Sequence, residues 1–225
     1  MQRDEVMTNS HYRKFGKAMG IEFRGIYDEN IGLHTGDGLG DKCSRIESLA
    51  RVGLRTIDQQ MAITNVNDLN PHAVKQYNSA LLSYKKENGL HDFTDMLEQY
   101  NSQLPVDICI FDEAQDLSSA QYKMAILAAS LASEVYIAGD DDQAIFGWAG
   151  ADVHKFLNLK GQKSTLPNSH RIPRKVHLLA NDVSSRIKNR YPKKWAPKKE
   201  EGEVYYVTNE QDIDFSNPGT WMLLS

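Results

Sequence analysis

The sequence contains few cysteines and no long apolar run. Its 225 residues include two cysteines, Cys43 and Cys109, so neither a disulfide framework nor a cysteine-bound zinc site is expected. No stretch of about 18 apolar residues occurs, which argues against a membrane-spanning helix. The N-terminus lacks the apolar segment of a secretory signal. A cytoplasmic location without a membrane partner fits these absences.

Acidic and basic residues are unevenly distributed along the chain. Residues 154–199 contain 13 Lys and Arg but one acidic residue, although the whole chain has a formal net charge of −4. Such a basic block can bind a polyanion such as nucleic acid. A solvated helix face followed by a lysine-rich loop is the alternative, and composition alone leaves both interpretations open.

The first 88 residues are predicted to be mostly helical. Apolar residues recur at helical spacing in 12–19 and again in 73–86. Between these segments lies a glycine-rich stretch, 32–40. Because it follows no clear strand and has no GKS or GKT ending, we interpret it as a flexible turn rather than a nucleotide-binding loop.

After Gly89 the pattern becomes that of an α/β fold. Residues 106–111 form a short apolar run rich in β-formers, typical of a strand that is buried on both faces of a parallel sheet. A helix over 118–133 and a second strand over 134–138 should follow. Strand, helix and strand at this spacing predict a βαβ unit with parallel strands.

Further elements are expected nearer the C-terminus. Residues 173–189 predict another helix, in which Pro173 suits the first turn. The stretches 203–207 and 220–224 have the composition of strands. The chain stops directly after the second of these, which is an unusual place for a natural domain to end.

The first candidate site is the string DEAQD (112–116), which begins where the strand 106–111 ends. Open α/β sheets bind ligands at the carboxyl ends of their strands. An aspartate such as Asp112 can hold Mg²⁺ through water there, and a neighbouring glutamate, Glu113, can deprotonate a water for attack on a γ-phosphate. The alternative is that both carboxylates only cap a helix N-terminus.

The second candidate site is the string GDDDQAIFGWAGA (139–151), which follows the second strand. It combines a strand-end Gly-Asp pair with Gln143 and with two aromatic residues, Phe146 and Trp148, that lie among glycines. This order would place an amide near a phosphate and flat rings on the adjacent surface, where bases stack without regard to sequence. A solvated acidic turn and a surface anchor packed on a helix are the alternatives.

Together these strings resemble motifs II and III of UvrD/Rep/PcrA-type superfamily 1 DNA helicases, in the same order and with a fitting gap. Two further strings agree with this resemblance. Residues 91–97 resemble the family's DFDDLL segment, and residues 166–171 resemble its motif IV, L-x-x-N-Y-R-S. The resemblance covers about residues 89–181, and the motif III string is the most specific part of it.

The resemblance implies an ATP–Mg²⁺ site formed by four residues. Asp112 would bind Mg²⁺, and Glu113 would be the catalytic base. Gln143 would contact the γ-phosphate and couple hydrolysis to DNA. Arg171 would reach the γ-phosphate from a second motor domain.

The same resemblance would place Phe146 and Trp148 against the bases of single-stranded DNA. Two positions depart from the family pattern. His170 stands where the family usually has a tyrosine that packs near the nucleotide. Ala149 stands where an arginine is common, which would remove one contact with DNA or between domains.

The largest departure is a missing motif. No G-x-x-x-x-G-K-[ST] string occurs in the sequence, although phosphate affinity in these enzymes depends mainly on that loop. The family's motifs V and VI also have no match. The chain is therefore expected to be an internal piece of a helicase that is inactive alone. The missing N- and C-terminal parts would be its partners, and Met1 would be an internal or engineered start.

The predicted fold is α/β, a RecA-like parallel sheet flanked by helices. A helical insertion would span 1–88, the C-terminal part of a first RecA-like domain 89–162, and the start of a second 163–225. The predicted activity is ATP-dependent 3′–5′ translocation on single-stranded DNA or partial duplex, in a process such as DNA repair or replication. Three rival functions remain: a non-catalytic nucleic-acid-binding module, a carboxylate-dependent metal nuclease, and a protein-interaction scaffold.

Overall fold

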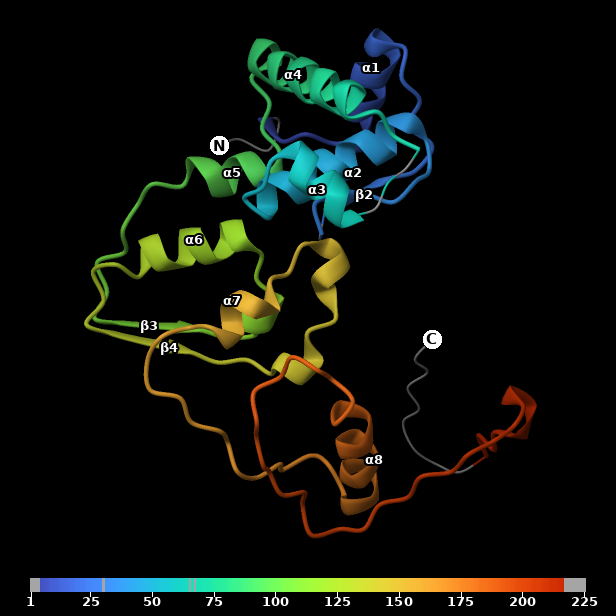
Figure 1. The fold of residues 1–225 in the computed structure, drawn as a ribbon, viewed down its shortest axis with the longest axis vertical. Coiled ribbons are helices and arrows are strands. Elements are labelled where there is room, and N and C mark those ends of the chain that lie inside the picture. The colour runs from blue at the N-terminus through green and yellow to red at the C-terminus, as the bar shows by residue number, and fades with distance from the viewer. Residues whose placement is uncertain (1–4, 30, 65, 67, 217–225) are drawn as a thin grey trace. The chain divides into compact units, whose positions relative to one another are not determined.

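Helices dominate the first 100 residues, as the spacing of their apolar residues predicts. A computed structural model describes residues 5–29, 31–64, 66 and 68–216. Its N-terminal helices are α1 (Asn9–Met19), α2 (Leu39–Val52), α3 (Ile57–Thr64), α4 (Pro71–Asn88) and α5 (Phe93–Gln99) (Figure 1). Two short strands, β1 (Tyr27–Asp28) and β2 (Leu33–His34), pair antiparallel between α1 and α2.

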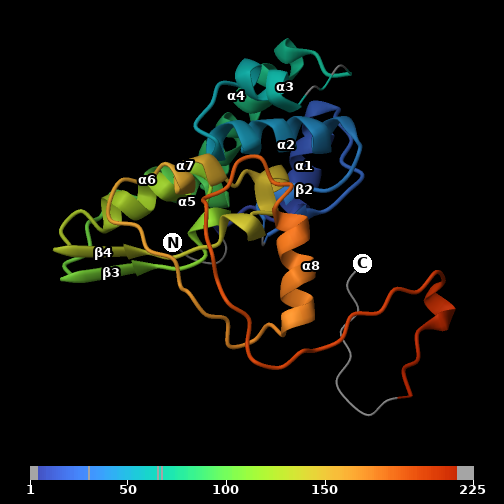
Figure 2. The same cartoon turned by 60° about the horizontal axis from the view of Figure 1, so that its bottom comes forward.

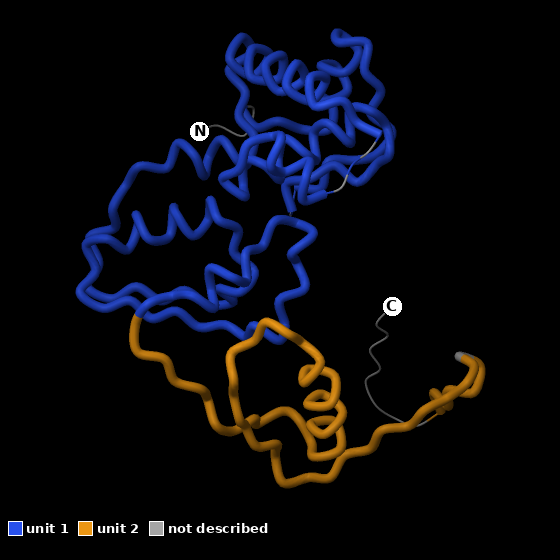
Figure 3. Tube along the Cα trace, in the orientation of Figure 1, with its two compact units in different colours: residues 1–160 blue, residues 161–225 orange. Residues whose placement is uncertain are grey.

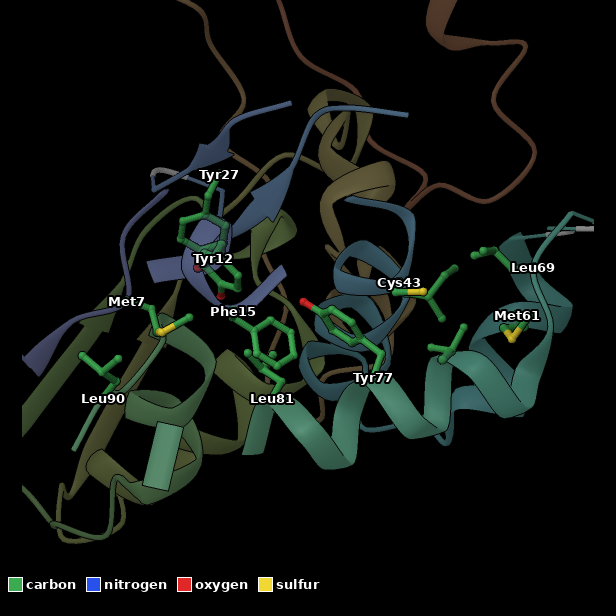
Figure 4. Close-up of a cluster of buried hydrophobic side chains, with 12 residues drawn as sticks. Met7, Tyr12, Phe15, Tyr27, Cys43, Met61, Leu69, Tyr77, Leu81 and Leu90 are labelled. Carbon is green, nitrogen blue, oxygen red and sulfur yellow. The ribbon is translucent and has the colours of Figure 1, made fainter. Parts of the chain in front are cut away.

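The main hydrophobic core lies among these helices (Figure 4). Its central side chains come from α1 and α4 and are at most 2% exposed: Tyr12, Phe15, Val74, Tyr77 and Leu81. The rings of Phe15 and Tyr77 meet edge to face with centroids 5.5 Å apart, a favourable geometry for aromatic pairs. Each such burial stabilises the fold by roughly 1.5–3 kcal/mol.

Local signals set the ends of α4. The side chain of Asn70 accepts a hydrogen bond from the backbone N–H of His72, and Pro71 occupies the first turn. Both are favoured at helix N-termini, because the cap satisfies a free N–H and proline has none to satisfy. Gly89 ends the helix with φ 64°, a left-handed conformation in which a side chain would be strained.

The glycine-rich stretch 32–40 forms part of the β1–β2 hairpin and the first residues of α2. The buried carboxylate of Asp41 holds the surrounding loop, because its Oδ2 accepts backbone N–H bonds of 2.8–3.1 Å from Arg24, Gly25 and Gly38. A Cβ on Gly25 would lie 2.2 Å from the nitrogen of Gly36, so the close approach requires glycine. The stretch is therefore more than a turn, since it includes β2 and the first residues of α2.

A βαβ unit follows the helical segment, as predicted. β3 (Ile108–Phe111) and β4 (Glu134–Ile137) pair in parallel, with Phe111 opposite Ile137. The connecting helix, α6 (Ser119–Ala128), is shorter than expected and lies along one face of the two strands (Figures 1 and 2). Side chains of α6, β3 and β4 together line an apolar cavity of about 250 Å³ on that face.

The expectation that these strands are buried on both faces is wrong. Ile108, Ile110 and Tyr136 are 54%, 71% and 55% exposed. Within the described residues this sheet has two strands, and α6 covers the face opposite these side chains. An apolar run shows that a strand is suited to burial, but it does not show which other strands and helices are present to bury it.

The chain divides into two units, residues 1–160 and 161–225 (Figure 3). The short helix α7 (Val153–Leu157) belongs to the first unit, and α8 (Arg174–Ser184) belongs to the second. Pro173 precedes α8 as its N-cap rather than lying in its first turn, and the helix ends before the expected residue 189.

Residues 203–207 are described but do not form a strand. Among the described residues no strand pairs with them, and single strands are not stable alone. The other expected strand, 220–224, lies outside the described residues. Cys43 and Cys109 are both free. Among the helices of the described residues, none has the length and apolar character needed to cross a membrane.

Candidate functional site

The two candidate strings lie side by side at the carboxyl ends of β3 and β4. The backbone N–H of Ala138 donates to the carbonyl of Phe111 over 2.8 Å, and the N–H of Ala114 donates to the carbonyl of Ala138 over 2.9 Å. Parallel pairing thus continues past both strands. It places the turn that carries Asp112 and Glu113 next to the segment that leads to Gln143.

Asp112 and Glu113 are both exposed at this edge. Asp112 Oδ1 accepts the backbone N–H of Glu113 over 2.9 Å. Glu113 has φ 52°, a left-handed conformation that costs roughly 1–2 kcal/mol for a residue with a side chain. Such strain is common at functional sites, where the surrounding structure holds the residue in place.

These carboxylates do not cap α6. The cap is Ser118, whose Oγ accepts the backbone N–H of Gln121 over 3.3 Å. In return, Gln121 Oε1 accepts the backbone N–H of Ser118 over 2.7 Å. This reciprocal pair is a capping box. Capping of α6 by Asp112 or Glu113 is therefore excluded.

Gln115 lies beneath the turn and is 1% exposed. Its Nε2 donates to Glu113 Oε2 over 2.8 Å and to Asp116 Oδ2 over 3.1 Å. Its Oε1 accepts the backbone N–H of Asp140 over 3.0 Å. Burial raises the pKa of Asp116, the hydrogen bond from Gln115 opposes this shift, and the charge of Glu113 adds to it.

Gln143 ends a 3₁₀ turn, η3 (Asp141–Gln143), that Asp140 caps. Asp140 Oδ1 accepts the backbone N–H of Asp142 over 3.2 Å. Asp140 Oδ2 accepts a bond from Gln143 Nε2 over 2.7 Å. The exposed amide of Gln143 therefore folds back onto Asp140 in this structure.

Phe146 and Trp148 lie on the next 3₁₀ turn, η4 (Phe146–Ala149), and are 39% and 62% exposed. Their ring centroids are 6.5 Å apart, with 48° between the ring planes. Gly150 has φ 102°, and a Cβ there would lie 2.8 Å from Val52 Cγ2, so the turn abuts α2. Trp148 is thus a surface residue whose ring is accessible to solvent.

Arg171 and His170 belong to the other unit, in the exposed loop before α8. The backbone N–H of Arg171 donates to Ser169 Oγ over 3.3 Å. Many side chains of the basic block 154–199 are also exposed. The ammonium of Lys163 lies 5.6 Å from the ring centroid of Tyr191, within cation–π range.

The carboxylate at the end of β3 suits Mg²⁺ bound together with a nucleotide. In the part of the chain that the structure describes, no group of three or more His, Cys, Asp or Glu side chains could hold a metal ion. Mg²⁺ commonly takes one or two protein carboxylates and completes its shell with water and substrate phosphates. The exposed Asp112 meets that requirement for one ligand.

A comparison with known protein families shows which family this chain belongs to. Residues 40–164, more than half of the chain, match the UvrD/REP helicase N-terminal domain family. This chain belongs to that helicase family. The match begins within α2 and includes both strings at the ends of β3 and β4, so the resemblance inferred from the sequence is confirmed.

Individual helicases show the same relationship. The chain is 28% identical to ATP-dependent DNA helicase Rep of Buchnera aphidicola (58% of this chain, 22% of that protein). It is 30% identical to ATP-dependent DNA helicase PcrA of Leuconostoc citreum (55% and 17%). It is 33% identical to DNA helicase II of Haemophilus influenzae (46% and 15%). The chain thus spans about a fifth or less of the length of these curated relatives.

The two residues that connect the candidate strings, Gln115 and Asp140, were not identified from the sequence. Gln115 is the one uncharged polar residue in DEAQD, and this contrast was the available signal. Polar residues in turns are usually exposed, so the sequence gives no reason to expect a buried amide. Asp140 reads as one of three acidic residues in a row, and only the fold distinguishes it as the cap of η3.

Proposed function

We propose that this chain forms part of an ATP-dependent DNA helicase, with residues of both its ATP-hydrolysis site and its DNA-contacting surface. The main observation is that the turn with Asp112 and Glu113 adjoins the segment with Gln143 at the carboxyl ends of two parallel strands. Ligands bind at this edge of open α/β sheets. The exposed pair Phe146 and Trp148 follows Gln143 on the same segment.

Each of the four proposed ATP-site residues would have a separate role. Asp112 would hold Mg²⁺, which neutralises phosphate charge when it is bound. Glu113 would accept a proton from the attacking water. Gln143 would turn its amide from Asp140 toward the γ-phosphate. Arg171 would add positive charge near the same phosphate.

DNA contact would combine stacking with charge. Phe146 and Trp148 present accessible rings on which bases can stack, and each stacked base contributes about 1–3 kcal/mol. The exposed basic residues of 154–199 would bind backbone phosphates, which makes the affinity depend on salt. Because stacking needs unpaired bases, single-stranded DNA or a partial duplex is the proposed substrate.

In this proposal the two strands belong to a larger RecA-like sheet. The exposed apolar side chains of β3 and β4 support this, because parallel sheets are normally covered on both faces. The helical insertion would be 1–88, the first RecA-like part 89–162, and the start of the second 163–225. The 3′–5′ direction and other parts of the same helicase as partners follow from the resemblance to UvrD/Rep/PcrA-type helicases. A cytoplasmic location is proposed because the sequence has only two cysteines.

Glu113→Gln tests the proposal in the full-length helicase, meaning the longer polypeptide in which this segment would occur. Glutamine keeps the shape of the side chain and removes the base. ATP binding should persist, while DNA-stimulated ATP hydrolysis should fall by about 10²-fold or more. Both are measured on the same preparation, by nucleotide titration and by phosphate release.

Glu134→Gln is the matched control. It removes the same charge from the same sheet, but at the amino end of β4, and should leave hydrolysis unchanged. Substantial hydrolysis by the Glu113→Gln variant would contradict the assignment of the base. A wild-type protein that binds single-stranded DNA without hydrolysing ATP would favour the non-catalytic binding module.

A further inference from the structure

We infer that Gln115 is a positioning residue that couples the proposed base, Glu113, to the turn that carries Gln143. The inference rests on the proposed function for its catalytic meaning. Its structural basis does not depend on ATP, because the buried amide of Gln115 forms hydrogen bonds both to Glu113 in the first string and to Asp140 in the second.

The surroundings of Gln115 fix the orientation of its amide. The NH₂ group faces two carboxylate oxygens, from Glu113 and Asp116, and the carbonyl oxygen faces the backbone N–H of Asp140. A carboxylate only accepts and a backbone N–H only donates. If the amide were turned over, its oxygen would face the two carboxylates and its NH₂ group would face the N–H of Asp140. All three hydrogen bonds would then be lost. Glutamine is therefore suited to this place, whereas an apolar side chain would satisfy none of the three groups.

The hydrogen bonds continue to Gln143. Gln115 Oε1 holds the backbone of Asp140, and the carboxylate of Asp140 accepts bonds from the backbone N–H of Asp142 and from Gln143 Nε2. The path from Glu113 to Gln143 thus contains two intermediate residues and no gap. A shift of the η3 turn would therefore change the hydrogen bond that Gln115 donates to the carboxylate of Glu113.

Packing around Gly139 supports the same role. A Cβ added to Gly139 would lie 2.5 Å from Gln115 Oε1 and 2.9 Å from Phe156 Cζ. The backbone at Gly139 does not itself require glycine, because its φ lies outside the left-handed region; the constraint comes from the packing of Gln115 and Phe156. The absence of a side chain at Gly139 therefore makes room for the amide of Gln115 and the ring of Phe156 just beyond the end of β4.

Hydrogen exchange on the 225-residue chain tests the link without ATP. Gln115→Met keeps the volume of the side chain and removes its donors and its acceptor. The backbone amide of Asp140 should then exchange at least about tenfold faster. Gln121→Met is the matched control, because it removes a glutamine whose hydrogen bond stays within the cap of α6, and it should leave Asp140 unchanged.

Kinetics of the full-length helicase separate positioning from general structural support. Gln115→Met should lower kcat by about 10²-fold, the scale of a small misplacement of a catalytic group, with the KM for ATP within about twofold of wild type. If Gln115 acts through Glu113, adding Gln115→Met to Glu113→Gln should cause no further loss, because the two residues work as a unit. A merely structural role would lower kcat in both backgrounds.

Three results would overturn the inference: unchanged exchange at Asp140 in the Gln115→Met chain, kcat within twofold of wild type, or a full additional loss in the double variant. Failure of the proposed function is a different result. In that case the wild-type helicase would not hydrolyse ATP, or Glu113→Gln would retain hydrolysis. The exchange rate at Asp140 would still decide whether Gln115 joins the two strings.

Discussion

The ammonium nitrogen of Lys85 lies 2.6 Å from a carboxylate oxygen of Asp92, and the two side chains are 4% and 5% exposed. Lys85 also pairs with Asp95 at 2.8 Å, and Arg51 contacts both carboxylates. Asp92 and Asp95 in turn cap α5 through bonds between each side chain and the other's backbone N–H. The string 91–97 therefore joins α2, α4 and α5 through one buried ionic cluster.

Lys85→Met should strongly destabilise the first unit. Methionine fills similar space but leaves buried carboxylates short of a partner, and breaking a buried ion pair costs about 3–5 kcal/mol. Lys75→Met on the same helix is the control, because its pair with Asp58 is half exposed and contributes about 1 kcal/mol or less. Urea unfolding followed by circular dichroism measures both. Similar losses in the two variants would contradict the prediction.

Two buried groups should give the first unit opposing dependences on pH. Burial raises the pKa of Glu47 to about 7, although the charge of Arg51 opposes the shift. Burial lowers the pKa of His34 to about 4. Between the ordinary value of 4.5 and about 7, folded Glu47 keeps a proton that the unfolded chain has lost, so its contribution to stability falls as pH rises. Between about pH 4 and the ordinary pKa of 6.5, His34 is protonated in the unfolded chain but neutral in the folded one. Its contribution to stability therefore rises with pH over this interval.

In a Glu47→Gln variant, the pH dependence of stability should therefore be the one that His34 causes. The variant's free energy of unfolding should rise by roughly 1–3 kcal/mol between pH 4.5 and 6.5, while that of the wild type changes less because the two slopes oppose each other. His34→Gln should show the reverse, a stability that falls over the same interval. Urea unfolding at three pH values measures each slope. A Glu47→Gln variant with the pH dependence of the wild type would contradict this assignment.

Sequence predicted elements well where local signals act alone. The helix expected over 73–86 is observed as α4, because its apolar spacing, the Asn70-Pro71 start and Gly89 all act within one segment. The parallel pairing of β3 and β4 is also observed as expected, because strand, helix and strand follow one another at the spacing of a βαβ unit. The structure also places Asp112, Glu113 and Gln143 just beyond the carboxyl ends of β3 and β4, where the strand pattern predicts them.

The features that sequence did not predict depend on distant partners. The composition of 203–207 suits a strand, but a strand needs a neighbour. The ion pair of Lys85 and Asp92 joins two helices, and spacing on one helix cannot show it. The burial of Gln115 depends on the space left by Gly139, which follows the other strand.

The 225-residue chain alone should bind ATP–Mg²⁺ poorly and should not turn it over. The sequence lacks the G-x-x-x-x-G-K-[ST] loop, whose backbone N–H groups and lysine supply most phosphate affinity in such enzymes. Titration of a fluorescent ATP analogue into the purified chain measures this directly. Low-micromolar affinity would mean that the chain has a phosphate site of another kind.

Trp148 should contribute to DNA binding and little to stability. It is 62% exposed, and a Cβ on the neighbouring Gly147 would meet nothing within 4 Å. These surroundings differ from those of a core tryptophan, which stands among large apolar side chains. Trp148→Ala in the full-length helicase should weaken single-stranded DNA binding by roughly 1–3 kcal/mol, the contribution of one stacked base.

The same substitution in the 225-residue chain separates stacking from packing. Its free energy of unfolding should change by less than about 1 kcal/mol, as for most exposed positions. Phe15→Ala is the contrast, because Phe15 is 2% exposed and losing a buried aromatic ring costs about 3–5 kcal/mol. Fluorescence anisotropy with labelled oligonucleotides gives the DNA affinity, and urea unfolding gives the stability. A large loss of stability with unchanged DNA affinity would show that Trp148 packs against its neighbours rather than stacking on bases.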